Sequence, residues 1–185
     1  MVSIPFDLRD EASIAAAAAR CGADGPLHLV FVATGVLHDG TALQPEKTWR
    51  ALTAPSLAES FAVNAIGPAL LAKHFLPRLA TGEKAVFAAL SARVGSIEDN
   101  RLGGWYSYRA SKAALHMLLR TLAIELARRN PTALCVALHP GTVDTALSRP
   151  FQPGVPDGRL FTPRQSAEHL LRVICPDMGG GFGIK

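Results

Sequence analysis

The sequence predicts an α/β protein in which a parallel sheet is covered by helices on both faces, that is, a three-layer, doubly wound fold. Three nearly continuous apolar runs predict the strands, at Leu27–Ala33, Lys84–Leu90 and Thr132–Leu138. Strands that are covered on both faces have this pattern, because neither side meets water. Helical stretches alternate with these runs along the chain, and such alternation is typical of a doubly wound sheet.

Four helices are expected. Asp10–Arg20 begins at a capping aspartate and continues through a tract of alanines. Pro55–Leu79 is long and apolar on one side, and Trp105–Arg129, the strongest helix, ends at an Asn-Pro pair. Pro163–Ile174 follows a capping threonine and has proline at its first position, where a missing N–H costs nothing.

The length of 185 residues suits one domain with a sizeable core. We place this domain at residues 1–174 and expect residues 175–185, with their glycine-rich run, to be a tail of uncertain structure. The proline- and glycine-rich stretch Arg149–Gly158 is interpreted either as a lid near a site or as a plain connection.

Composition argues against several classes of function. The 19 Lys and Arg residues are dispersed and outnumber the 15 acidic residues only slightly, so no basic stripe predicts a nucleic-acid partner. The three cysteines lie far apart without metal-ligand spacing, so no metal is expected. No apolar run approaches the ~20 residues of a membrane span, and no signal peptide is evident. We therefore expect a cytoplasmic protein without a membrane partner.

The sharpest chemical feature is the pair Tyr108 and Lys112, which a helix places one turn apart on the same face, with Cβ atoms roughly 5–6 Å apart. A free phenol has a pKa of about 10, and a cation nearby lowers it by roughly 1–3 units. A tyrosine with such a pKa can exchange a proton with a carbonyl or alcohol oxygen. The spacing alone is weak evidence, because many helices contain it by chance.

Three further motifs surround this pair. N-A-I-G-P stands at residues 64–68, S-A-R-V-G-S at 91–96 and H-P-G-T-V-D-T at 139–145, on either side of Y-S-Y-R-A-S-K-A-A-L at 106–115. This ordered set resembles the short-chain dehydrogenase/reductase family, and within it the branch of the C-factor-type and sniffer-type carbonyl reductases. The resemblance covers roughly residues 7–174. It implies a Rossmann-like fold and an oxidoreductase.

The resemblance implies roles for the site residues. Tyr108 would be the general acid/base, Lys112 would tune it and bind the nicotinamide ribose, and Asn64 would anchor a water molecule in a proton relay. The cofactor, NADP or NAD, would contact Asp7, Thr34, Gly35, Tyr108, Lys112, Pro140, Gly141, Thr142 and Thr145.

The active-site serine is open. Where the family has two serines, this chain has Ser91-Ala92, and Ala92 takes the position that usually helps to orient the substrate oxygen. We favour Ser91 over Ser96 as the source of the hydroxyl. Alternatively, neither serine acts and the Tyr/Lys pair works alone.

The resemblance begins only near the end of the family's third strand, at Asp7. The first βαβ segment, including the glycine-rich turn that binds the pyrophosphate, has no counterpart in this sequence. The resemblance implies that the determinant that separates NADP from NAD would lie in that segment. We expect the strand Leu27–Ala33 to become an exposed edge and the isolated chain to be weakly active or inactive.

The leading reading is thus an NAD(P)-dependent enzyme that interconverts a small-molecule carbonyl and alcohol. A non-catalytic remnant that acts through self-association or partner binding is the second reading, and a basic nucleic-acid-binding module is the third. Self-association, as a dimer or larger homo-oligomer, is expected because two helices carry more apolar residues than one sheet face covers: Leu70, Leu71, Phe75, Leu118, Leu119 and Leu122. Alternatively, these residues all face the sheet.

Overall fold

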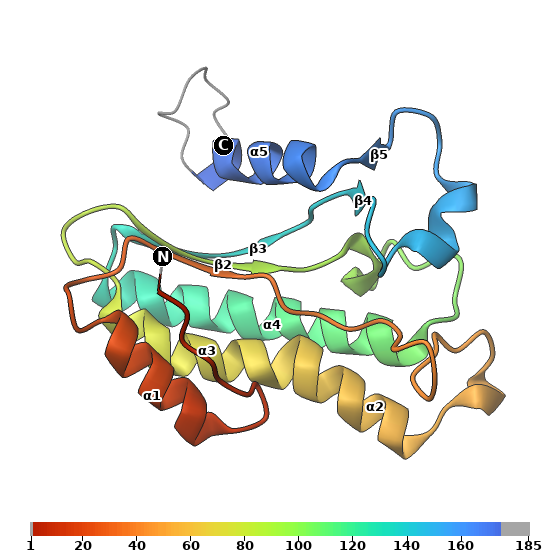
Figure 1. The fold of residues 1–185 in the computed structure, drawn as a ribbon, viewed down its shortest axis with the longest axis horizontal. Coiled ribbons are helices and arrows are strands. Elements are labelled where there is room, and N and C mark those ends of the chain that lie inside the picture. The colour runs from red at the N-terminus through yellow and green to blue at the C-terminus, as the bar shows by residue number, and fades with distance from the viewer. Residues whose placement is uncertain (1, 175–185) are drawn as a thin grey trace. The chain divides into compact units, whose positions relative to one another are not determined.

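The computed structural model describes residues 2–174, so the expected tail at residues 175–185 lies outside the described residues (Figure 1). The chain divides into two compact units, with the boundary after Ala137. The helices of the first unit are α1 (Glu11–Cys21), α2 (Ala54–Phe61), α3 (Gly67–Phe75) and α4 (Tyr106–Arg129), and its strands are β1 (Leu29–Val32), β2 (Ala85–Leu90) and β3 (Ala133–Leu138).

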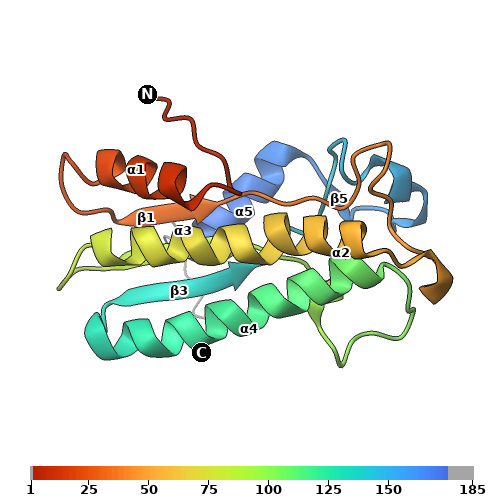
Figure 2. The ribbon, with the colours of Figure 1, turned by 90° about the horizontal axis from the view of Figure 1, so that it is seen from below.

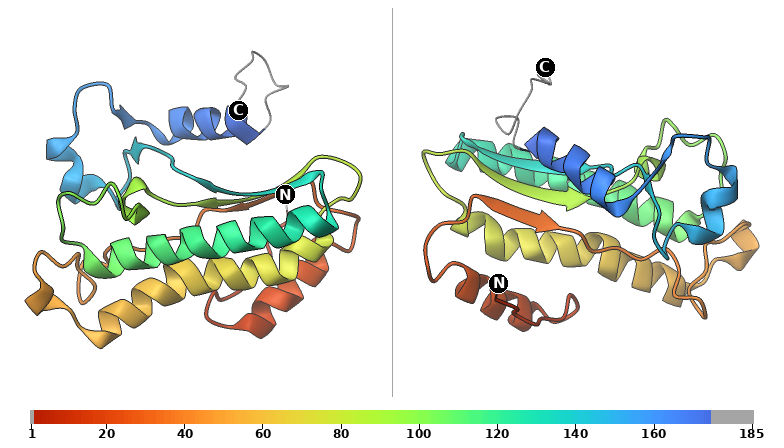
Figure 3. Two further views of the ribbon diagram at one scale, coloured as in Figure 1. Left: turned by 180° about the vertical axis from the view of Figure 1, so that it is seen from behind. Right: turned by 45° about the horizontal axis from the view of Figure 1, so that its top comes forward.

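The sheet of the first unit has the strand order β1-β2-β3. β1 and β2 are parallel, with Leu29 paired to Val86 and Val32 paired to Ala89 (Figure 3). The predicted α/β fold with a parallel sheet is confirmed, and each strand lies inside its predicted apolar run. In β1, one of the two edge strands of this sheet, Leu29 and Phe31 are 40% and 38% exposed.

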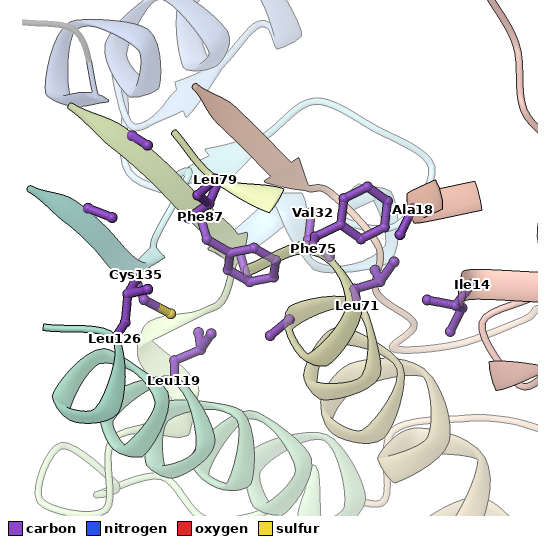
Figure 4. Close-up of a cluster of buried hydrophobic side chains, with 14 of the residues drawn as sticks. Ile14, Ala18, Val32, Leu71, Phe75, Leu79, Phe87, Leu119, Leu126 and Cys135 are labelled. Atoms are coloured by element: carbon purple, nitrogen blue, oxygen red, sulfur yellow. The ribbon is translucent and has the colours of Figure 1, made fainter. Parts of the chain in front are cut away.

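Helices α1 to α4 all cover one face of this sheet, with α1, the α2–α3 segment and α4 side by side (Figures 1 and 2). The core lies between the helices and the sheet (Figure 4). Phe87 in β2 and Ile14 in α1 are fully buried there, and Leu119 of α4 is 2% exposed. Of the residues expected to drive self-association, Leu71, Phe75 and Leu119 are buried in this core, whereas Leu118 is 36% exposed. Self-association therefore stays a prediction.

Pro55–Leu79, expected as one continuous helix, is divided. A π-helical turn at Ala62–Ile66 separates α2 from α3, and a 3-10 turn at Leu76–Arg78 follows α3. Pro68 explains the break, because a proline has no N–H to donate and its ring crowds the carbonyl four residues earlier, that of Asn64. Gly67 permits a close contact there, since a Cβ at this position would lie 2.6 Å from Leu8 Cδ2.

The second unit contains a short parallel pair, β4 (Thr142–Val143) with β5 (Leu160–Phe161), followed by α5 (Pro163–Ile174). Residues 149–154 of the predicted loop form a 3-10 helix. Thr162 caps α5 as expected, because its Oγ1 accepts a hydrogen bond from Gln165 N at 3.2 Å. Gly141 has φ 76°, and a Cβ there would lie 2.6 Å from the Phe161 ring, so a glycine is needed at this turn.

The cap of α1 gives a first prediction. The Asp10 carboxylate accepts a hydrogen bond from Ala12 N at 3.0 Å and thereby satisfies one of the free N–H groups at the helix start. Asp10→Ala is expected to lower the free energy of unfolding by about 1 kcal/mol. Urea denaturation followed by circular dichroism measures this, with the exposed Asp24→Ala as control. A loss no larger than that of the control would contradict the capping role.

Candidate active site

The catalytic pair expected from the sequence lies near the start of α4. The chain enters this helix through Gly103, Gly104 and Trp105, which all have positive φ, with Trp105 at φ 52° and ψ 44°. For tryptophan this left-handed conformation is uncommon and costs energy, and such strain concentrates at functional sites. The Trp105 ring meets the Tyr108 ring edge to face, with the centroids 6.3 Å apart.

Lys112 lies one turn after Tyr108, as predicted. It is 3% exposed, and its Nζ donates a hydrogen bond to the backbone oxygen of Leu90 at 3.1 Å. The same Nζ lies 5.8 Å from the centroid of the Tyr108 ring. Because Leu90 is the last residue of β2, the bond fixes the ammonium at the carboxyl end of a parallel strand, where open α/β sheets bind their ligands.

Burial dominates the electrostatics of the pair. It raises the pKa of Tyr108 to about 12 and lowers the pKa of Lys112 to about 8. The sequence argument expected the cation to lower the pKa of the phenol, but desolvation acts in the opposite direction in this structure. Tyr108 is therefore a protonated hydroxyl at neutral pH, as a proton donor to a carbonyl oxygen must be.

The raised pKa of Tyr108 predicts a loss of stability in alkali. The unfolded chain releases the phenol proton near pH 10, whereas the folded protein keeps it to about pH 12. The contribution of this protonation to the free energy of unfolding is therefore complete below pH 10 and is lost between pH 10 and 12. The free energy of unfolding should fall by up to roughly 2 kcal/mol over this range, because the ring is partly exposed and solvent screens part of the effect. Urea unfolding across this range should show a steeper decline in the wild type than in Tyr108→Phe. Parallel declines in the two proteins would contradict the assignment.

Asn64 joins the loop after β1 to α4. It is completely buried in the π turn; its Oδ1 accepts from Val36 N at 2.8 Å, and its Nδ2 donates to Val36 O at 2.8 Å and to Ser111 Oγ at 3.1 Å. Ser111 lies directly before Lys112 in the sequence. The amide of Asn64 is thus occupied by protein groups, and its expected role in a water relay stays a prediction.

The two candidate serines have different surroundings. Ser91 is buried, and its Oγ lies 2.6 Å from Nε2 of His116, one turn beyond Lys112 on α4. The pKa of His116 is lowered, first by burial and then by the charge of Lys112. Ser96 Oγ instead accepts a turn hydrogen bond from Asp99 N at 3.3 Å. The choice between these serines stays open.

Besides Tyr108 and Lys112, the residues expected to contact the cofactor fall into three groups. Thr34 and Gly35 follow β1, and a Cβ on Gly35 would lie 3.5 Å from Lys112 Nζ. Asp7 lies outside any strand, with its side chain 61% exposed and 3.9 Å from Arg9. The four others, Pro140, Gly141, Thr142 and Thr145, belong to the second unit. Their roles toward a cofactor stay predictions.

A shallow cavity of about 270 Å³ lies beside the same helix. It is lined by residues 94–97, 100, 103 and 104 and by Tyr106, Arg109, Ala110 and Ala113 of α4. Tyr106 is two residues from Tyr108, about 200° around the helix, so this part of the cavity lies on the side of α4 away from Tyr108. Gly95, which also lines the cavity, packs against Lys112. We do not assign the reaction to it.

Comparison with known proteins decides the family. Residues 1–155 match the family model described as short chain dehydrogenase. The chain belongs to the short-chain dehydrogenase family. This confirms the resemblance expected from the motifs.

Three relatives of this short-chain dehydrogenase are informative. It is 39% identical over 129 residues to the C-signal of Myxococcus xanthus, covering 68% of this chain and 72% of the relative. It is 32% identical over 184 residues to 1-hydroxy-2-glutathionyl-2-methyl-3-butene dehydrogenase of Rhodococcus sp. (strain AD45), covering 95% and 74%. The structure of NADPH-bound carbonyl reductase from chicken fatty liver has a TM-score of 0.77 at 31% identity, covering 94% of this chain and 66% of that one.

The carbonyl reductase Sniffer of D. melanogaster has the same fold, with a TM-score of 0.75 at 24% identity, over 91% of this chain and 68% of that one. The chain thus spans about two thirds to three quarters of the length of these proteins. In residues 2–174 we find no helix with the length and apolar character needed to cross a bilayer. The same residues contain no cluster of three or more His, Cys, Asp or Glu side chains suited to a metal ion.

Proposed function

We propose that this short-chain dehydrogenase interconverts a carbonyl compound and its alcohol with NADP or NAD. The observation that carries the proposal is the protonated, largely buried Tyr108 beside Lys112, whose Nζ is fixed to the end of β2. A bound reduced nicotinamide would supply a hydride to the carbonyl carbon. Tyr108 would donate its hydroxyl proton to the carbonyl oxygen, which completes the alcohol.

Two features of the first unit support a nicotinamide cofactor. Thr34 Oγ1 is buried without a hydrogen-bond partner among the described residues, so a ligand hydroxyl or amide would satisfy it. Lys112 donates to Leu90, and an ammonium has three protons, so it can also donate to ribose hydroxyls. Gly35 leaves room for a ligand beside this ammonium, because it has no Cβ.

A binding measurement tests this assignment. We expect the fluorescence of NADPH to rise on titration with the protein. Lys112→Ala should weaken binding about 10- to 100-fold, because a charge-assisted hydrogen bond is worth roughly 1.5–3 kcal/mol. Lys73→Ala is the matched control, since Lys73 is exposed and pairs with Glu11 on the surface. A parallel titration with NADH establishes the preferred cofactor.

Absence of binding by either cofactor would overturn the proposal and favour the non-catalytic reading, in which the chain acts through self-association or partners. Equal affinity of Lys112→Ala and wild type would remove Lys112 from the cofactor site. The substrate is left as a small carbonyl compound or alcohol, to be identified by screening aldehydes and ketones with the preferred cofactor.

A further inference from the structure

Glu46 is a buried acidic residue outside every motif of the sequence. It lies in the loop between β1 and α2 and is only 5% exposed. Burial of an acidic side chain is costly unless hydrogen bonds compensate for it. Glu46 has such bonds, and all of those given by the structure go to the turn that begins α4, about 60 residues further along the chain.

Glu46 contacts this turn through both its side chain and its backbone. One carboxylate oxygen accepts a hydrogen bond from Ser107 N at 3.2 Å, and the other accepts one from Ser107 Oγ. The backbone oxygen of Glu46 accepts from Trp105 N at 2.5 Å. Gly104 also lies close, since a Cβ there would be 3.4 Å from the same backbone oxygen.

The start of α4 needs an external acceptor. The residue at the N-cap position is Trp105, and an indole has no oxygen with which to cap free N–H groups. The first turn of α4 contains no acidic residue either. The Glu46 carboxylate therefore satisfies an N–H group there and places its negative charge at the positive end of the helix.

The contacts surround the residues that lead to Tyr108. The backbone oxygen of Glu46 contacts Trp105, which has the left-handed conformation, and the Glu46 carboxylate contacts Ser107, directly before Tyr108. Strained backbone of this kind persists only where its surroundings determine it. Without the carboxylate, we expect this turn to relax and the ring of Tyr108 to move with it.

We propose that Glu46 is a positioning residue, which fixes the first turn of α4 and thereby the direction of the Tyr108 hydroxyl. The catalytic part of this inference rests on the proposed function. The structural part, that Glu46 holds Tyr108 in its buried place, does not depend on it and can be tested without turnover.

The chain contains only two tyrosines, Tyr106 and Tyr108, which allows a direct optical test. In a Tyr106→Phe background, tyrosinate absorbance near 295 nm reports on Tyr108 alone. Its titration midpoint, measured by rapid pH jumps before the protein unfolds, is expected near pH 12. Adding Glu46→Ala should lower the midpoint by about one unit toward the value of about 10 for an exposed phenol, because the loosened turn admits water to the ring.

Three companion variants make the result specific. Glu46→Gln keeps an acceptor for Ser107 N and a donor for Ser107 Oγ, so the titration midpoint of Tyr108 should return most of the way to its wild-type value. Ser107→Ala removes one of the side-chain bonds and should give an intermediate shift. Glu125→Ala is the matched control, since it removes an exposed carboxylate that pairs with Arg129 at the far end of the same helix.

Kinetics then test the catalytic part. Displacement of a reacting group by about 1 Å can cost on the order of 10²-fold in rate, so Glu46→Ala should lower kcat by 10- to 100-fold with KM changed less than threefold. Glu46→Gln should recover most of kcat. A large change in KM together with the lower kcat, or a kcat in Glu46→Gln as low as in Glu46→Ala, would overturn the positioning role.

The outcomes separate the two proposals. An unshifted Tyr108 midpoint in folded Glu46→Ala would overturn the inference, whatever the activity. A shifted midpoint in a protein that binds neither NADPH nor NADH would support the link between Glu46 and the first turn of α4, called the tether here, and would rule out the proposed function. If circular dichroism shows that Glu46→Ala does not fold, Ser107→Ala decides the matter: a shifted midpoint supports the tether and an unshifted one overturns it.

Discussion

Tyr108→Phe is expected to reduce kcat for carbonyl reduction by about 10²- to 10⁴-fold, the contribution typical of a general acid. Phenylalanine keeps the ring and its contact with Trp105 but has no hydroxyl proton to donate. NADPH affinity should change less than about twofold, because the expected cofactor contact on this helix comes chiefly from Lys112. Initial rates at saturating cofactor and the fluorescence titration measure the two effects separately.

Tyr106→Phe is the matched control for this variant. It removes the same hydroxyl two residues earlier, from the helix face that lines the shallow cavity and lies away from Tyr108. Its kcat should stay within about threefold of the wild type. Equal losses in the two variants would show that neither hydroxyl is the specific proton donor.

Asn64→Leu is expected to lower the free energy of unfolding by roughly 3–5 kcal/mol. Leucine has nearly the same shape but leaves the N–H and the carbonyl of Val36, which are partly buried, without these partners, and an unsatisfied group costs about 1–3 kcal/mol where water cannot reach it. The bond from Asn64 Nδ2 to Ser111 Oγ is lost as well. Urea denaturation gives the free energy directly.

Asn100→Ala serves as the comparison, because its side chain accepts an exposed hydrogen bond from Gly103 N and should cost under about 1 kcal/mol. A loss for Asn64→Leu as small as this would mean that the loop after β1 is held by other contacts. A large loss of stability would identify Asn64 as the structural link between this loop and α4.

The sheet could be predicted from the sequence because burial leaves a pattern there. β2 is buried along almost its whole length, and its apolar run marks it. The break between α2 and α3 was missed because a single π turn barely disturbs the spacing of apolar residues, although Gly67-Pro68 was a signal for it. β4 and β5 have two residues each, which is too short for any pattern.

The site was predictable only in part. The motifs predict Tyr108, Lys112 and Asn64 as site residues, and the structure places Asn64 within hydrogen-bond distance of Ser111, directly before Lys112. The spacing of Tyr108 and Lys112 showed that they are neighbours but not how deeply they lie, so the direction of the pKa shift of Tyr108 was wrong. Glu46 could not be found, because its partner Ser107 is 61 residues away and no local pattern joins them.

The transfer of deuterium from NADPH carrying deuterium at nicotinamide C4 tests the central claim most directly. The protein is used in excess over a carbonyl substrate from the screen, so that even slow turnover is detected. The mass of the alcohol product is measured by mass spectrometry. With deuterium on one face of nicotinamide C4, we expect the wild type to give an alcohol one mass unit heavier, and with deuterium on the other face an unlabelled alcohol. Tyr108→Phe is expected to give at least 10²-fold less of the labelled alcohol in the same time. An alcohol without deuterium whichever face of the nicotinamide carries the label, or equal labelling by the two proteins, would contradict the account.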